Sequence, residues 1–232
     1  MRAEIARIQR DLGVTTVYVT HDQTEAMTMG DRVAVMRNGL LQQIDTPQVL
    51  YERPRNLFVA EFIGSPAMNL ALAEVAAEDG AFWVRVGEQR VRLADDATSR
   101  HPGLGAFEGR QVVLGIRPED MEDASLASAG SSDRTLSVLT DIREDMGSEV
   151  YVHFNLDAPP VTTKEVLDAK SIDAPEDAEA RVAAEQARGR GVRFVARVDR
   201  TTSAREGENL TLAVDVDRLH FFDPESGLAV AA

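Results

Sequence analysis

Apolar residues in the first 64 positions follow first a helical and then a strand-like spacing. Ile5, Ile8 and Leu12 are three and four positions apart, which places them on one face of a helix that ends at Gly13. Residues 14–20 follow as the β-branched run VTTVYVT. A helix followed at once by such a run predicts an α/β unit in which residues 14–20 form a buried parallel strand.

Capping and turn residues mark the further elements of this first region. Asp22 is a typical helix N-cap, and Glu25 three positions later completes a capping-box pattern. Asn38-Gly39 between two apolar runs predicts a tight β-hairpin. Two more helices are expected to open after Thr46 and after Asn56.

The pattern changes from about residue 67 onward, where short apolar runs are separated by turn residues. Such runs alternate apolar and polar positions, as half-buried antiparallel strands do. The expected strands lie at residues 70–75, 82–86, 89–93, 112–116, 135–143, 149–156, 192–199, 209–215 and 228–230. This density of strands predicts a small all-β barrel or sandwich.

The two patterns meet at Gly64-Ser65-Pro66, where a helix-stopping glycine precedes a proline. We therefore expect one domain in residues 1–64 and a second in residues 65–232. Residues 157–190 interrupt the second domain with a run rich in Ala, Asp, Glu and Pro. This composition buries little apolar area and predicts an exposed, mobile insertion that is helical at most around residues 176–188.

Composition and charge narrow the classes of function. The chain has 232 residues and a net charge of −14, and a surface that acidic repels phosphate backbones, so nucleic acid is not an expected partner. It has no cysteine, hence neither disulfides nor thiolate chemistry. No apolar stretch is long enough to span a membrane, and the N-terminus lacks a signal-peptide pattern. A soluble protein is expected, with any membrane role exerted through a protein partner.

His21 is the leading candidate for chemistry because it follows the expected strand and precedes the helix capped by Asp22. Ligands of parallel α/β sheets bind at the carboxyl ends of strands, where an imidazole and the peptide N–H groups of a helix start can meet an anion. A structural histidine is the alternative from this local pattern. Gln23 has two open interpretations, a dimer-interface residue or a solvated helix residue.

The remaining candidates carry weaker signals. His101, His153 and His220 are scattered and lack metal-ligand spacing, so they are interpreted as surface or hydrogen-bonded histidines. Phe82 and Trp83 lie in an expected strand and are interpreted as packing residues rather than as a stacking platform for a ligand.

A long stretch of the chain resembles the ATP-binding subunits of ABC importers of the maltose, trehalose and glycerol-3-phosphate type. The stretch contains YVTHDQTEAM, DRVAVM, RNG and TP, then LY and FVAEFIGSPAMN, and later LGIRPE. The resemblance implies an α/β remnant in residues 1–64, the C-terminal part of a RecA-like nucleotide-binding domain. It implies an all-β OB-like regulatory (TOBE) barrel in residues 65–232.

The same resemblance implies a function. His21 matches the switch histidine, which contacts the γ-phosphate of ATP, and the cofactors of the full-length subunit are ATP and Mg²⁺. The implied partners are a second copy of the subunit, the permease subunits, cytosolic regulators and, indirectly, an extracytoplasmic solute-binding protein. The implied location is cytoplasmic, on the inner face of the cell membrane. The transported solute stays open, beyond being sugar or sugar-like.

The motifs that hold the nucleotide in this family are absent from the chain. It contains no Gly-Lys pair, hence no G-x-x-x-x-G-K-[ST] loop, and it lacks the signature sequence and the Walker B residues. We expect a fragment, a truncated product or a wrongly assigned start, without ATPase activity on its own. The alternative function is a non-enzymatic regulatory or dimerisation module of such a transporter.

Overall fold

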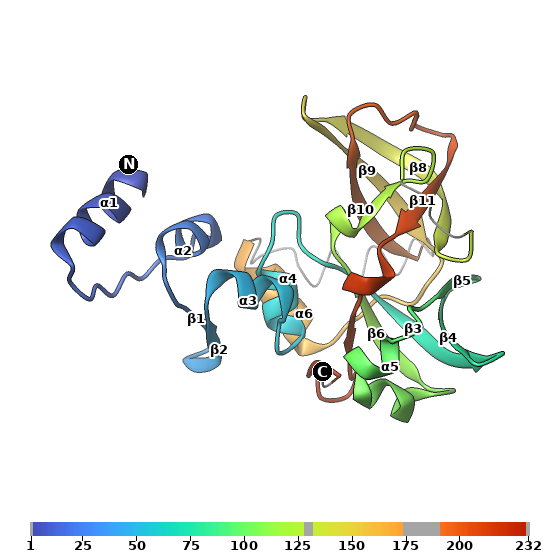
Figure 1. Cartoon of the computed structure of the whole chain (residues 1–232), viewed down its shortest axis with the longest axis horizontal. Helices are drawn as coiled ribbons and strands as arrows, with labels where there is room; N and C mark the ends of the chain where they lie inside the picture. The colour runs from blue at the N-terminus through green and yellow to red at the C-terminus, as the bar shows by residue number, and fades with distance from the viewer. Residues whose placement is uncertain (1, 128–131, 174–190, 231–232) are drawn as a thin grey trace.

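Two five-stranded antiparallel sheets form the centre of the second half of the chain, and helices with a short hairpin precede them (Figure 1). The structure is a computed structural model that describes residues 2–127, 132–173 and 191–230. The elements up to residue 64 are α1 (Arg2–Leu12), α2 (Gln23–Met29), β1 (Val33–Arg37), β2 (Leu40–Asp45), α3 (Pro47–Glu52) and α4 (Leu57–Phe62).

The elements after residue 64 are mainly strands. They are β3 (Asn69–Glu78), β4 (Ala81–Val86), β5 (Gln89–Arg92), α5 (Ala97–Arg100), β6 (Gln111–Ile116), β7 (Met121–Asp123), β8 (Thr135–Asp145), β9 (Glu149–Leu156), α6 (Lys164–Asp173), β10 (Val192–Asp199), β11 (Asn209–Val214) and β12 (His220–Phe222).

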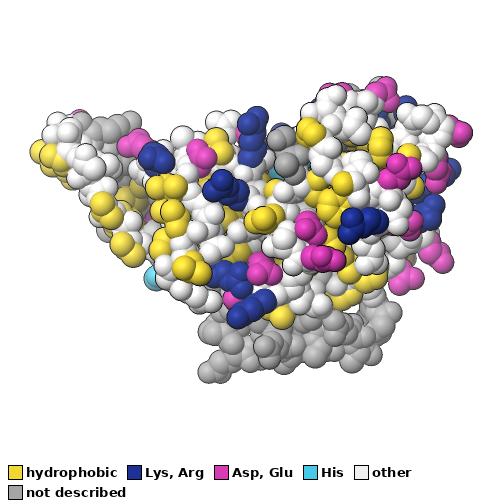
Figure 2. All heavy atoms as spheres, turned by 90° about the horizontal axis from the view of Figure 1, so that it is seen from below, with side chains coloured by type: hydrophobic (Ala, Val, Ile, Leu, Met, Phe, Trp, Pro, Cys, Tyr) yellow, Lys and Arg dark blue, Asp and Glu magenta, His cyan; other side chains and the backbone are white. Residues whose placement is uncertain are grey.

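Helix α1 forms where its apolar spacing predicts it, and Gly13 follows it with a φ of +61°. Its apolar side chains Ile5, Ile8 and Leu12 are 40, 49 and 66% exposed. In Figure 1 this helix lies at the end of the molecule far from the sheets, and Figure 2 shows hydrophobic side chains on the surface at that end. The apolar stripe of α1 is therefore open to solvent in this chain.

Residues 14–20 do not form the predicted buried strand. The run has no strand pairing, and Val17 and Val19 are 88 and 90% exposed. A parallel strand needs neighbours on both sides to take up its N–H and C=O groups. No strand in the described residues pairs with this run. The prediction was wrong because β-propensity depends on the side chains of the segment itself, whereas a strand also needs a second strand to pair with.

The hairpin and the two helices after it are confirmed. Asn38 and Gly39 have φ values of 50° and 78°, the left-handed conformation that a two-residue hairpin turn requires, and β1 pairs with β2 antiparallel. The side chains of Thr46 and Asn56 accept hydrogen bonds from peptide N–H groups of α3 and α4 and so cap both helices, as predicted.

The β-rich second half is confirmed as two antiparallel sheets. One has the strand order β12-β6-β3-β4-β5 and the other β10-β9-β8-β11-β7. All predicted strands except 228–230 are formed. That segment makes only isolated bridges, Asn56 with Leu228 and Phe222 with Ala229. Strands β7 and β12 were not predicted, because three residues are too few to show an alternating pattern.

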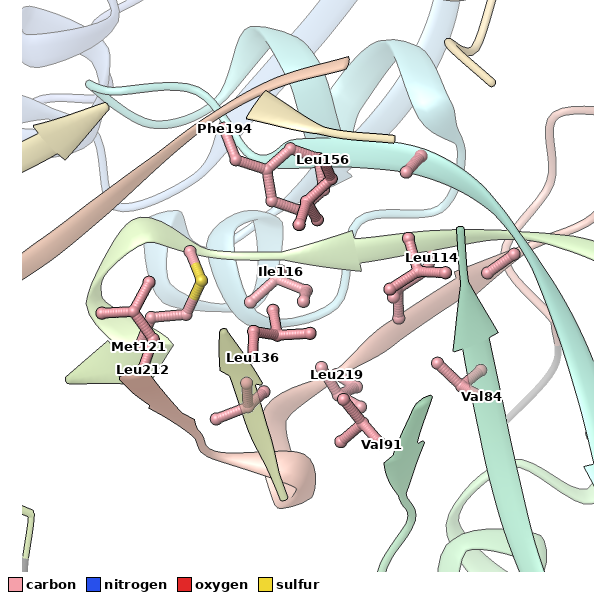
Figure 3. Packing of buried hydrophobic residues seen from close by; sticks show 14 of the residues in the cluster. Val84, Val91, Leu114, Ile116, Met121, Leu136, Leu156, Phe194, Leu212 and Leu219 are labelled. Carbon is pink, nitrogen blue, oxygen red and sulfur yellow. The ribbon is translucent and has the colours of Figure 1, made fainter. Parts of the chain in front are cut away.

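A single hydrophobic core lies between the two sheets (Figure 3). Along β9, alternate residues point inward, and Val150, Val152 and Phe154 are fully buried. The side chains labelled in Figure 3 come from both sheets and from the segment before β12: Val84, Val91, Leu114, Ile116, Met121, Leu136, Leu156, Phe194, Leu212 and Leu219. The two sheets of the second half therefore share one core.

Helix α4 is buried on two sides and joins the first elements to the sheets. Its Leu57 and Ala60 pack with Met68, Val113 and Phe222 of the sheet region. On its other side, a second cluster contains Phe58, Val59 and Ile63 from α4 and its C-cap, together with Val35 and Leu50. The packing thus continues across Gly64, and a domain division at residue 64 remains a prediction.

Helix α6 corrects the prediction of an exposed loop for the first part of residues 157–190. Val166 and Ala169 are 1 and 3% exposed and belong to the clusters that contain α4. Arg37 of β1 binds α6 from the side, with Nε 2.8 Å from Asp168 and Nη1 3.2 Å from Glu165. The composition of residues 157–190 gave no indication of this apolar face of α6. The helix expected at residues 176–188 lies outside the described residues.

Candidate functional site

His21 occupies an exposed bend between residues 14–20 and helix α2. The bend is fixed by Asp22, whose Oδ1 accepts hydrogen bonds from the N–H groups of Thr24 at 2.7 Å and Glu25 at 3.1 Å. Asp22 is therefore the N-cap that the sequence predicts. Since these two N–H groups are already bonded to Asp22, the helix start does not offer them to an anion as the sequence interpretation expected.

A second set of hydrogen bonds braces the bend from the other side. The hydroxyl of Thr20 accepts from the N–H of Asp22 at 3.0 Å and donates to Glu25 at 2.8 Å. The phenol of Tyr18 donates to the same Glu25 carboxylate at 3.0 Å. His21 is thus an exposed side chain on a backbone that its neighbours hold in place.

Gln23, the first residue of α2, connects this bend to a point 41 positions further along the chain. Its side-chain carbonyl accepts from the N–H of Gly64 at 2.8 Å, and its amide donates to the carbonyl of Gly64 at 3.3 Å. Two antiparallel hydrogen bonds between one side chain and one residue's backbone fix both distance and orientation. Sequence reasoning noticed Gln23 but gave no sign of this contact.

Gly64 in turn lies against the buried side chain of Arg117. It has a φ of +128°, and a Cβ added there would lie 2.7 Å from Arg117 Nη1, so only glycine fits. Arg117 is 1% exposed. Its guanidinium donates to the carbonyls of Ile63 and Tyr51, at 2.8 Å for Tyr51, with a longer contact to Ala60. These carbonyls end α3 and α4, where a cation is favoured.

The electrostatics around Arg117 follow from its burial. Desolvation lowers the pKa of Arg117, and nearby Tyr51, Glu119 and Asp120 oppose that shift. Burial, together with a hydrogen bond to Glu119, raises the pKa of Tyr51 to about 12. Tyr51 is therefore a neutral donor at physiological pH, and Glu119 is its acceptor.

The structure keeps the other sequence candidates apart from His21. His101 packs edge-on against Phe221, His153 Nε2 lies 3.1 Å from a Glu144 oxygen, and His220 is largely buried. Burial lowers the pKa of His220 to about 3, so its ring is neutral at pH 7. These environments are those of structural histidines.

Trp83 lies under the guanidinium of Arg90, 4.6 Å from the ring centroid, while Phe82 packs against the core. One face of the Trp83 ring is thus already in contact with an arginine.

The described residues offer few groups that could bind ATP and Mg²⁺. No three His, Asp or Glu side chains converge to hold a metal ion within the described residues. The residues present therefore do not by themselves fit a bound nucleotide with its metal. Among the described helices, none has the length and apolar character of a membrane span.

Comparison with known proteins finds one family model that matches part of the chain and several relatives that match nearly all of it. Residues 64–121, which contain both Gly64 and Arg117, match the family described as the MalK OB-fold domain. The chain is 39% identical over 231 residues to the trehalose/maltose import ATP-binding protein MalK of Thermococcus litoralis, with 99% of this chain covered. It is 43% identical over 232 residues to the trehalose import ATP-binding protein SugC of Mycobacterium tuberculosis, with 98% covered.

A third relative, the oligosaccharides import ATP-binding protein MsmX of Bacillus subtilis, is 32% identical over 230 residues. The chain spans about half the length of these relatives, 52 to 54%. Among solved structures, the cytoplasmic molybdate-binding protein ModG aligns with 66% of this chain and 94% of its own, at 10% identity and a TM-score of 0.39. That similarity is too low to assign a shared fold or ligand.

Proposed function

We propose that this chain, a relative of the ATP-binding subunits of sugar importers that carries a MalK OB-fold domain, is the C-terminal portion of such a subunit. The subunit would couple ATP hydrolysis to the uptake of a sugar or a sugar-like solute. The observation that carries the proposal is similarity at 39 to 43% identity over nearly the whole chain to import subunits. The division into an ATPase part, residues 1–64, and an OB-like regulatory part, residues 65–232, belongs to this proposal.

His21 is the residue we assign to nucleotide contact, as the switch histidine. Its exposure and the braced bend support the role, because phosphoryl transfer depends mainly on positioning and on charge stabilisation. One hydrogen bond to a charged group contributes about 1.5–3 kcal/mol, whereas micromolar affinity needs about 8 kcal/mol. ATP and Mg²⁺ would therefore be held mainly by residues outside this chain, and the chain alone would not hydrolyse ATP.

The partners and the location follow from the same proposal. A second copy of the subunit and the permease subunits would be direct partners, and an extracytoplasmic solute-binding protein would act through the permease. Cytosolic regulators would bind the OB-like part. The subunit would work on the inner face of the cell membrane. Support comes from the names of the relatives, which are import ATP-binding proteins.

Replacing His21 with Ala in the chromosomal gene tests the assignment. Uptake of labelled trehalose and maltose should fall at least about tenfold at equal protein level, because one transition-state contact is lost. Gln48→Ala is the matched control, since Gln48 is exposed and bonds only to Glu52 of its own helix in the hydrogen bonds observed. For whichever of the two sugars depends on the gene for its uptake, unchanged uptake in His21→Ala would remove the proposed role. Steady ATP hydrolysis by the purified chain, lost in His21→Ala, would contradict its expected inactivity.

The alternative function is a regulatory or dimerisation module without catalysis. The observation in its favour is the self-contained core between the two sheets, which does not depend on α1, α2 or residues 14–20. A truncated variant of residues 46–232 keeps α3 and α4, which pack on that region. Stable dimers of this variant in analytical ultracentrifugation, with normal uptake in His21→Ala cells, would favour the alternative.

A further inference from the structure

We propose that Gln23 is a positioning residue for His21, and that its double hydrogen bond to Gly64 couples the bend at His21 to the OB-fold domain. The inference rests on the proposed function of His21. Gly64 is the first residue of the segment that matches the MalK OB-fold domain. The contact therefore connects the two parts of the chain at one defined residue, Gly64.

At the start of α2, the side chain of Gln23 determines the orientation of the helix. Gln23 and Met27 are four positions apart and lie on the same face of α2. Met27 packs against the cluster formed by Val35, Leu50 and other apolar residues. An apolar contact of this kind fixes distance but tolerates rotation, because it has no directional preference. The two hydrogen bonds of Gln23, 2.8 and 3.3 Å, supply the direction.

The bend transmits that direction to His21. Asp22 lies between His21 and Gln23, and its carboxylate bonds the N–H groups of Thr24 and Glu25. Its own N–H is bonded to Thr20. A bend held on both sides of His21 cannot absorb a displacement of Gln23 locally, so it must pass the displacement to His21.

Gly64 is held equally firmly on the other side. Arg117 lies too close for any side chain at position 64, and its guanidinium bonds the carbonyl of Ile63, the preceding residue. A movement of Arg117 must therefore move the peptide group that Gln23 holds. A ligand or partner that shifts the OB-fold domain would change the position of His21 through these contacts. By linkage, phosphate contact at His21 would bias the OB-fold domain in return.

The test uses the full chain and two variants of Gln23. Gln23→Ala removes both hydrogen bonds, whereas Gln23→Glu keeps an acceptor for the N–H of Gly64 but loses the donor to its carbonyl. Hydrogen exchange is measured at the Gly64 amide, and NMR follows the imidazole signal of His21, assigned with His21→Ala. His101, His153 and His220 provide internal reference signals. Gln48→Ala is the control variant.

We expect Gly64 exchange about tenfold faster in Gln23→Ala, as for the loss of one protecting hydrogen bond, with near wild-type exchange in Gln23→Glu. The His21 signal should shift in both variants, more in Gln23→Ala, and stay unchanged in Gln48→Ala. Unchanged Gly64 exchange in Gln23→Ala would overturn the proposal. So would faster exchange without a His21 shift beyond that of the control, because Gln23 would then hold Gly64 without positioning His21.

These measurements need no nucleotide, so they separate the coupling from the proposed function. Uptake that survives His21→Ala while the NMR changes occur would leave the coupling in place and remove its role in ATP hydrolysis. The reverse pattern would keep the role of His21 and remove the coupling through Gln23.

Discussion

The guanidinium of Arg117 stacks on the ring of Tyr51, 4.0 Å from the ring centroid, and donates a hydrogen bond to the carbonyl of the same tyrosine. Arg117 comes from the segment that follows β6, whereas Tyr51 lies in α3. A single buried side chain thus binds the ends of α3 and α4 to the sheet region. Because Arg117 is charged and almost fully buried, its carbonyl partners are essential to it.

Arg117→Lys should lower the free energy of unfolding by about 2 kcal/mol. Lysine keeps the charge but lacks the planar fork that bonds several carbonyls and stacks on the ring. Urea denaturation provides the measurement. Arg110→Lys is the matched control, since Arg110 is exposed and stacks on Phe107 at 5.4 Å, and it should change stability by less than about 0.5 kcal/mol. Equal effects of the two substitutions would contradict the buried role of Arg117.

Arg37→Ala should release helix α6 and cost about 2 kcal/mol, because Arg37 is only 14% exposed and bonds two carboxylates of α6. Amide exchange in α6 should accelerate more than exchange in β9. The control is Arg85→Ala, whose side chain is 46% exposed and pairs with Glu74 and Glu78. An exposed ion pair contributes little, so the control should change stability by less than about 0.5 kcal/mol. Unaltered α6 exchange in Arg37→Ala would show that apolar packing alone holds the helix.

Two truncated variants should show whether the sheet region depends on α3 and α4 for its stability. The variant 46–232 keeps α3 and α4, whereas 65–232 removes both and exposes Met68, Val113 and Phe222. Each of these buried side chains contributes about 1.5–3 kcal/mol. We expect 65–232 to be at least about 4 kcal/mol less stable than 46–232 in thermal and urea unfolding. Equal stability would mean that α4 is dispensable for the sheet region.

Asp120 should make stability depend on pH in the neutral range. Burial raises its pKa to about 7, one carboxylate oxygen pairs with Arg218 at 2.9 Å, and the other has no hydrogen-bond partner within the described residues. The folded state then binds more protons than the unfolded state between about pH 4 and 7, so stability falls as pH rises through that range.

Asp120→Asn removes this dependence, and the gain in stability over wild type should grow from pH 6 to pH 8. His220, with its pKa lowered to about 3, acts in the opposite direction and only below about pH 6.5, where the unfolded state binds its proton. Urea titrations of both proteins at pH 6, 7 and 8 isolate Asp120, because the His220 contribution is the same in wild type and variant and cancels in their difference. A pH-independent difference between wild type and variant would disprove the assignment.

Local signals in the sequence predicted most of the elements. The caps at Asp22, Thr46 and Asn56, the turn at Asn38-Gly39 and the alternation along the β-strands all depend on nearby residues, and all are confirmed. Long-range contacts were not predictable in this way. The burial of Arg117 and the contact between Gln23 and Gly64 depend on residues more than 40 positions away, and nothing nearby in the sequence indicates them.

Helix α6 was not predicted from the sequence. Its composition is that of a solvated loop, yet Val166 and Ala169 are three positions apart and buried, and Glu165 and Asp168 share the same spacing beside Arg37. The spacing was the available signal. The run 14–20 is the converse case, a strong strand signal without a partner strand in the described residues.

The run 14–20, which has no strand pairing in the described residues, also offers a site for enzymatic cleavage. Proteases bind several consecutive residues whose backbone is free of secondary structure, and residues 14–20 meet that condition. Tyr18, 53% exposed, offers chymotrypsin the aromatic side chain that it selects. Brief digestion after Tyr18 should therefore detach α1 and leave His21 as the third residue of the remaining protein, a preparation that shows how the bend behaves without the Tyr18 bond to Glu25.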